Sequence, residues 1–134
     1  MPRLTIAGEE IFYTHQTGDR KRNLIYIHGA GGNHLYWPHQ LRRMRGPDVY
    51  TLDLSGHGRS QGKGRSSIAA YRDFVLAFLG ALGLGRATLV GHSMGGAITL
   101  DFALHYPASL EGIILIGSGA RLRVAPAILE SILQ

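Results

Sequence analysis

The 134-residue sequence contains no cysteine and a single tryptophan. The absence of cysteine excludes disulfide bonds and thiolate-ligated metal sites. No apolar run approaches the length of about 18 residues that is typical of a membrane-spanning helix. The amino terminus, MPRLTIAGEE, lacks the apolar stretch of a signal peptide. We therefore expect a cytoplasmic protein with no integral membrane segment.

Acidic side chains are also scarce, since 9 Asp and Glu residues stand against 14 Lys and Arg residues and the net charge is +5. Such an excess can indicate nucleic-acid binding. Here the basic residues are scattered, and their densest group, LRRMR at 41–45, has no aromatic residues interleaved with it. We interpret this group as the solvated face of a helix and predict no nucleic-acid partner.

Glycine, by contrast, is abundant at 19 residues, which favours tight turns and close backbone approaches. Between the turns lie short, continuously apolar segments that are typical of buried strands. They are LIYIHG from residue 24, DVYTLDL at 48–54, RATLVGHS at 86–93 and LEGIILIGSG at 110–119. Two further strands, at 4–7 and 11–15, flank the turn AGEE and predict an amino-terminal hairpin.

Helical patterns alternate with these strands. We expect a short helix at 37–45, a helix from Ser66 or Ser67 to about Leu82, a helix over Met94–His105 that Pro107 ends, and the start of another near Pro126. Alternation of buried strands with helices predicts an α/β fold with a doubly wound, mostly parallel sheet.

The segment GHSMG at 91–95 lies where a predicted strand gives way to a helix. It matches the pattern G-x-S-x-G, in which a serine occupies a strained turn and glycines two residues away avoid collisions. The helix that follows directs its positive dipole and free N–H groups towards this position. We therefore predict that Ser93 is a catalytic nucleophile, although a plain glycine-rich turn would show the same five residues.

A second glycine-rich motif, IHGAGG at 27–32, follows another predicted strand. In sheets of this class the carboxyl ends of the strands meet at the ligand site. The backbone N–H groups of Ala30 and Met94 are therefore expected to form an oxyanion hole, in which each donor stabilises the transition state by about 2.7–4 kcal/mol. We expect His28 to hold this loop in place through its side chain.

Together, HGAGG, DLSGHGRS and GHSMGG resemble the α/β-hydrolase fold, and specifically its serine esterases and lipases, such as carboxylesterases and monoacylglycerol lipases. The resemblance implies the amino-terminal portion of that fold, with no metal or organic cofactor. It also implies that Asp53 and the loop containing His57 shape the edge of the site without catalysing the reaction. Because the residue at the predicted nucleophile position, Ser93, is a serine, the sequence argues against the dehalogenases and epoxide hydrolases that resemble this fold.

The order of a catalytic triad in this family is serine, then acid, then histidine. After Ser93 the sequence offers Asp101 and His105, which lie on the helix that Ser93 opens, about 12 and 18 Å along its axis. Since a nucleophile and its base must approach to about 2.6–3.2 Å, these two residues cannot complete a triad. From earlier in the chain, His34 or His57 could reach the serine from a loop.

We therefore expect that residues 1–120 form the amino-terminal part of a hydrolase core and that 121–134 begin a cap. The acid and the histidine would come from a complementary carboxyl-terminal polypeptide of the same protein, so the 134 residues alone should be inactive. Tyr36 and Trp37 could line the pocket, although an ordinary packing role is the simpler interpretation.

The function that this pattern favours is hydrolysis of a small-molecule carboxylic ester through an acyl-enzyme on Ser93. Alternatives within the fold are hydrolysis of a carbon–carbon bond in a dienone-type substrate and cofactor-free perhydrolysis. A ligand-binding relative without turnover is an alternative from another class.

Overall fold

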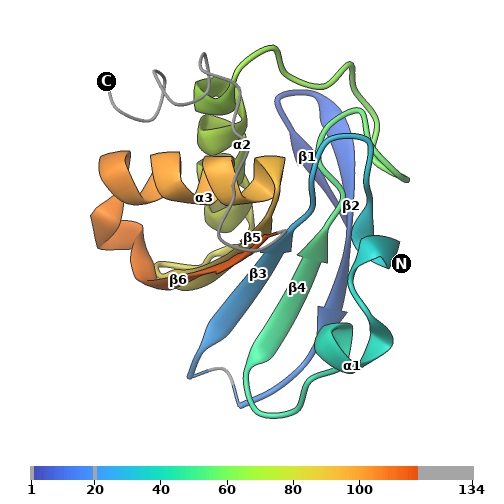
Figure 1. The fold of residues 1–134 in the computed structure, drawn as a ribbon. Helices are drawn as coiled ribbons and strands as arrows, with labels where there is room; N and C mark the ends of the chain where they lie inside the picture. Colours follow the sequence, from blue (N-terminus) through green and yellow to red (C-terminus); the bar gives the residue numbers. More distant parts are fainter. Residues whose placement is uncertain (1, 20, 118–134) are drawn as a thin grey trace.

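The computed structural model describes residues 2–19 and 21–117, and the predicted cap segment at 121–134 lies outside them. Six strands in this part of the chain form one sheet (Figure 1). They are β1 (Arg3–Ile6), β2 (Glu9–Gln16), β3 (Asn23–Ile27), β4 (Asp48–Leu52), β5 (Ala87–His92) and β6 (Leu110–Ile116). The helices are α1 (His39–Arg42), α2 (Ile68–Leu82) and α3 (Met94–His105), with 3₁₀ turns η1 (His34–Tyr36) and η2 (Pro107–Ser109).

The strand order is β1-β2-β4-β3-β5-β6. β1 and β2 form an antiparallel hairpin, and β2 also runs antiparallel to β4. The pairs β3–β4, β3–β5 and β5–β6 are all parallel. The structure thus confirms an α/β fold with a mostly parallel sheet and an amino-terminal hairpin.

Both faces of the central strands are buried, which explains why their sequences are continuously apolar. On one face, Ile25 and Ile27 of β3 pack in a large cluster with residues of α2 and α3. On the opposite face, Tyr26 of β3 packs with Trp37 and partly buried residues of the α1 segment. The alternation follows from the two-residue period of a strand.

The two long helices begin and end where local signals place them. The Ser67 side chain accepts a hydrogen bond from Ala70 N–H at 3.0 Å and caps α2, so Ser67 rather than Ser66 is the cap. Gly83, with φ of 74°, ends α2 in the left-handed conformation that favours glycine. Helix α3 spans Met94–His105, as predicted.

The expected helix at 37–45 is wrong in extent. Helix α1 covers only His39–Arg42, because Trp37 is extended and Pro38 precedes the helix. The preceding segment, for which no regular structure was expected, contains η1. The side chain of Asn33 caps this turn by accepting a hydrogen bond from Leu35 N–H at 2.8 Å.

Candidate active site

Ser93 lies between the end of β5 and the start of α3, at the carboxyl edge of the parallel strands. Its backbone has φ of 56° and ψ of −117°. A residue with a side chain rarely adopts a positive φ, and such a conformation costs roughly 1–3 kcal/mol. The side chain is exposed at the tip of this tight turn. Strain of this kind persists only where the surrounding structure enforces it.

The glycines two residues before and after Ser93 permit the turn. A Cβ on Gly91 would collide with the carbonyl oxygen of Gly95 and lie 2.6 Å from Thr99 Oγ1. A Cβ on Gly95 would collide with the carbonyl oxygen of Ile27 and lie 2.7 Å from that of His28. The structure confirms the steric reason for the G-x-S-x-G spacing: α3 begins in direct contact with the end of β3.

The loop after β3 passes directly beside Ser93. A Cβ on Gly29 would lie 3.1 Å from Ser93 Cβ and 3.5 Å from Ser93 Oγ. Ala30 follows Gly29 in this loop, and Met94 follows Ser93. Within the described residues, neither the Ala30 N–H nor the Met94 N–H has a hydrogen-bond acceptor. Two unused backbone donors therefore belong to the segments that meet at the serine.

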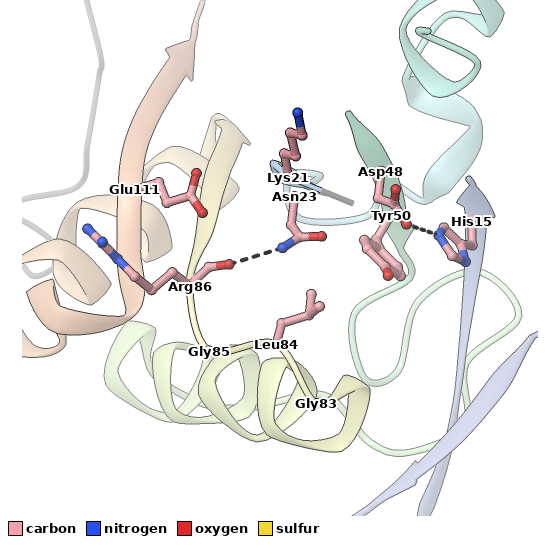
Figure 2. A pocket seen from close by; sticks show the side chains of 10 residues that line it. All are labelled: His15, Lys21, Asn23, Asp48, Tyr50, Gly83, Leu84, Gly85, Arg86 and Glu111. Carbon is pink, nitrogen blue, oxygen red and sulfur yellow. Dashed lines mark hydrogen bonds and ion pairs between the residues drawn. The ribbon is translucent and has the colours of Figure 1, made fainter. Parts of the chain in front are cut away.

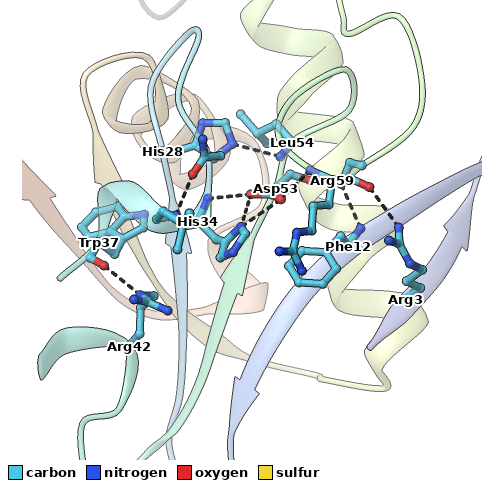
Figure 3. Close-up of polar contacts among 12 residues, drawn as sticks. Arg3, Phe12, His28, His34, Trp37, Arg42, Asp53, Leu54 and Arg59 are labelled. Carbon is cyan, nitrogen blue, oxygen red and sulfur yellow. Dashed lines mark hydrogen bonds and ion pairs between the residues drawn. The ribbon is translucent and has the colours of Figure 1, made fainter. Parts of the chain in front are cut away.

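His28 holds this loop, as its position suggested. It is fully buried, its Nδ1–H donates to the Gly29 carbonyl at 2.7 Å, and its Nε2 accepts from Leu54 N–H at 3.1 Å (Figure 3). Burial lowers the pKa of His28 below its ordinary value of 6.5. The neutral ring therefore joins the loop after β3 to the end of β4, and both of its nitrogens are used.

Asp53 connects the same loop to the segment after β4. Its buried carboxylate accepts hydrogen bonds from the His34 N–H, from His34 Nδ1–H at 3.0 Å and from Arg59 N–H at 2.9 Å (Figure 3). The sequence did not predict the His34–Asp53 pair. Because the His34 ring is directed to Asp53, its role in the structure is to fix η1.

The structure describes all seven histidines, and none forms a hydrogen bond with Ser93. His57 Nδ1–H donates to the Ser55 carbonyl at 3.0 Å within its own loop. His15 lies beside Asp48, with 2.9 Å between Nε2 and Oδ2. Among the described residues, no histidine is therefore in hydrogen-bond contact with the serine.

Asp101 and His105 have other partners as well. Asp101 Oδ2 lies 3.1 Å from Arg72 Nη1, so this buried carboxylate joins α3 to α2. His105 Nδ1–H donates to the Asp101 carbonyl at 2.9 Å, one turn earlier in the helix. These contacts agree with the conclusion that neither residue belongs to a triad with Ser93.

Tyr36 and Trp37 have different roles. Trp37 is 1% exposed and stacks on Tyr26 with 4.9 Å between ring centroids, which is a packing role. Tyr36 is 47% exposed and stacks on His92, the residue before Ser93, with centroids 4.2 Å apart. Tyr36 therefore borders the serine turn, a contact that sequence spacing could not reveal.

A hollow of about 510 Å³ lies at the opposite edge of the sheet (Figure 2). It is lined by residues at the amino ends of the strands, including Asn23 of β3, Asp48 of β4 and Glu111 of β6. Ligands of open α/β sheets bind at the carboxyl ends, so this hollow is not the candidate active site. In the described ranges, no three His, Asp or Glu side chains form a group that could hold a metal ion.

Comparison with known proteins identifies the class. The model of the alpha/beta hydrolase fold family matches residues 22–132. The chain belongs to this family.

Named relatives within the family have several activities. The chain is 32% identical over 125 residues to an uncharacterized hydrolase, YugF, of Bacillus subtilis, covering 90% of the chain and 45% of YugF. It is 36% identical over 115 residues to a 2-hydroxy-6-oxononadienedioate/2-hydroxy-6-oxononatrienedioate hydrolase of Burkholderia vietnamiensis, covering 78% of the chain and 39% of that enzyme.

A solved structure from work on carboxylesterases of Nitrososphaera gargenis superposes with a TM-score of 0.74 and 30% identity, covering 87% of this chain and 46% of that one. The chain thus has both esterase and other hydrolase homologues, and it spans less than half the length of the curated relatives it matches. Among the described helices, none has the length and apolarity needed to cross a membrane.

Proposed function

We propose that this chain supplies the nucleophile and the oxyanion hole of a serine hydrolase that cleaves carboxylic esters. The observation that carries the proposal is the strained backbone of Ser93 at an exposed strand-to-helix turn. A serine with no chemical role would gain nothing from a positive φ that glycine adopts without cost. The nucleophile elbow accounts for both the strain and the flanking glycines.

In this mechanism Ser93 Oγ attacks the ester carbonyl carbon while its proton passes to a histidine. The carbonyl oxygen becomes an oxyanion, which accepts hydrogen bonds from the unused N–H groups of Ala30 and Met94. The bond to the alcohol oxygen then breaks, and the alcohol leaves with the proton. Water then attacks the acyl-enzyme and gives a second proton to the histidine; the acid is released as the histidine passes this proton to Ser93 Oγ.

The acid and the histidine of this mechanism come from a carboxyl-terminal part of the protein that completes the sheet beside β6. Among the described strands, β6 pairs only with β5. Its residues Ile113–Ile116 are 36–47% exposed, which leaves an apolar edge strand uncovered. Here "the complete protein" means this chain together with that part, in one polypeptide or two.

The test is ester hydrolysis by the complete protein and by its Ser93→Ala variant, measured with p-nitrophenyl esters of increasing acyl length. Removing the nucleophile should lower kcat by a factor on the order of 10⁶ without unfolding the protein. Ser66→Ala is the matched control, because Ser66 is exposed and lies outside the site. Unchanged hydrolysis in Ser93→Ala would contradict the proposal.

A second candidate is hydrolysis of a carbon–carbon bond in a dienone, which the Burkholderia relative favours. It would use the same serine turn and the same oxyanion donors. Parallel assays with a p-nitrophenyl ester and a dienone ring-cleavage product separate the two, since the preferred substrate should show the larger kcat/KM. Saturable binding of either substrate without product would instead indicate a ligand-binding relative.

A further inference from the structure

A hollow of about 410 Å³ lies beside η1 and is lined by three arginines, Arg42, Arg43 and Arg59. No Asp or Glu side chain lines it in the described part of the chain. The sequence suggested that Arg42 and Arg43 belong to a solvated helix face. In the structure Arg43 is exposed and Arg42 partly exposed, and both line one concavity together with the exposed Arg59, which follows β4.

None of the three arginines forms an ion pair with a described carboxylate. This distinguishes them from Arg65 and Arg72, which pair with Glu9 and with Asp73 and Asp101 respectively. An arginine that lines a hollow without a carboxylate partner keeps its guanidinium donors available for an anion.

Each of the three side chains also has a contact within the described residues, the shortest of them at Arg42. Arg42 Nε–H donates to the Trp37 carbonyl at 2.8 Å, which leaves its terminal nitrogens free (Figure 3). Arg43 Nη1–H donates to Gln16 Oε1 at 3.2 Å. The Arg59 guanidinium lies 5.4 Å from the centre of the Phe12 ring. Groups held in this way lose less conformational freedom when a ligand binds.

We propose that this hollow binds the phosphate group of a small phosphate monoester. Three guanidinium groups match a doubly charged, three-oxygen acceptor better than a single carboxylate. The volume lies within the range of small-molecule pockets, about 300–1,000 Å³, and leaves room for an organic substituent. Leu35, which is 63% exposed and also lines the hollow, offers an apolar contact to that substituent.

The site is distinct from the proposed catalytic machinery. His34 and Leu35 of η1 line the hollow, whereas Tyr36 of the same turn stacks on His92 beside Ser93. The proposal does not depend on Ser93 being a nucleophile, and binding can be measured without turnover.

The test is isothermal titration calorimetry on the complete protein at low salt, with inorganic phosphate and with a short-chain, monomeric phosphatidic acid as probes. Arg43→Gln and Arg59→Gln should each weaken binding about tenfold or more, the usual effect of losing a charge-assisted hydrogen bond. Arg45→Gln is the matched control, because it removes the same charge from an exposed residue outside the hollow. It should change the affinity by less than about twofold.

The two probes distinguish the sources of the phosphate group. Tighter binding of phosphatidic acid that is lost in Leu35→Ala indicates a lipid headgroup, while equal binding of both probes indicates a soluble phosphate compound; both support the site. Absence of binding by either probe would overturn the proposal. Equal weakening in Arg45→Gln and in the two lining variants would also overturn it, because it would show diffuse attraction to a basic surface.

Discussion

At the scale of single residues, the glycines around Ser93 set the geometry of the turn. Gly95→Ala places a Cβ against the carbonyl oxygens of Ile27 and His28, so β3 and α3 must separate. We expect a loss of about 1–3 kcal/mol in the free energy of unfolding, as for other overpacked positions, together with loss of hydrolysis. Urea denaturation and an ester assay measure the two effects.

Gly96→Ala is the control for this substitution. Its Cβ would meet the nearest atom, the Gly91 carbonyl oxygen, at 3.7 Å, which is an ordinary contact. Because alanine favours a helix over glycine by up to about 1 kcal/mol, Gly96→Ala should leave stability unchanged or raise it. Equal destabilisation by the two variants would show that the close approach at Gly95 does not determine the turn.

The buried ring of His28 predicts a pH dependence of stability. Burial lowers its folded-state pKa below 6.5, so on acidification through that value the unfolded chain takes up a proton that the folded chain does not. The stability that depends on neutral His28 is therefore present above pH 6.5 and is lost as the pH falls below it. The slope contributed by this single group has an upper limit of about 1.4 kcal/mol per pH unit, the value for one proton.

His28→Gln keeps a donor and an acceptor but removes the titration. Its stability should fall less steeply than that of the wild type between pH 7 and 5, as measured by urea denaturation. His39→Gln, at an exposed position, should retain the wild-type slope. Parallel profiles for the wild type and His28→Gln would contradict this account.

At the scale of elements, the Ser67 cap should contribute measurably to α2. Ser67→Ala removes the hydrogen bond from Ala70 N–H, and the loss of such a cap costs about 1 kcal/mol of unfolding free energy. Ser66→Ala changes the same side chain one residue earlier and should cost less than about 0.5 kcal/mol. If the two variants are equally stable, the cap contributes nothing.

Local patterns predicted the long elements because their signals lie within a few residues of each other. The two ends of α3 were predicted from the serine turn at 93 and from Pro107. The positions of the strands were predicted from short apolar runs in the sequence. The extent of helix α1 was overestimated, because nothing within 37–45 showed that Trp37 would be extended and stack on Tyr26.

The site was predictable only in part, for the same reason. Ser93 and its glycines form a contiguous motif, so their geometry could be anticipated. The partners of the histidines could not, because His34 binds Asp53 and His92 stacks on Tyr36 across long stretches of sequence. The arginine-lined hollow likewise joins residues from separate segments of the chain.

At the scale of the whole molecule, the exposed strand β6 should make these 134 residues self-associate when they are produced alone. An unpaired edge with four consecutive apolar side chains is a template for pairing with another chain. Ile114→Lys places a charge on this edge and should reduce the association, as measured by size-exclusion chromatography with light scattering. A monodisperse wild-type monomer would argue against a missing neighbour of β6.

The central claim, that Ser93 is a nucleophile, is tested most directly by covalent labelling. The complete protein is treated with a fluorophosphonate under native conditions, digested, and analysed by peptide mass spectrometry. We predict one adduct on the peptide that contains Ser93 and no adduct in Ser93→Ala. Labelling at a different residue, or an unlabelled Ser93 in a preparation that hydrolyses esters, would contradict the claim.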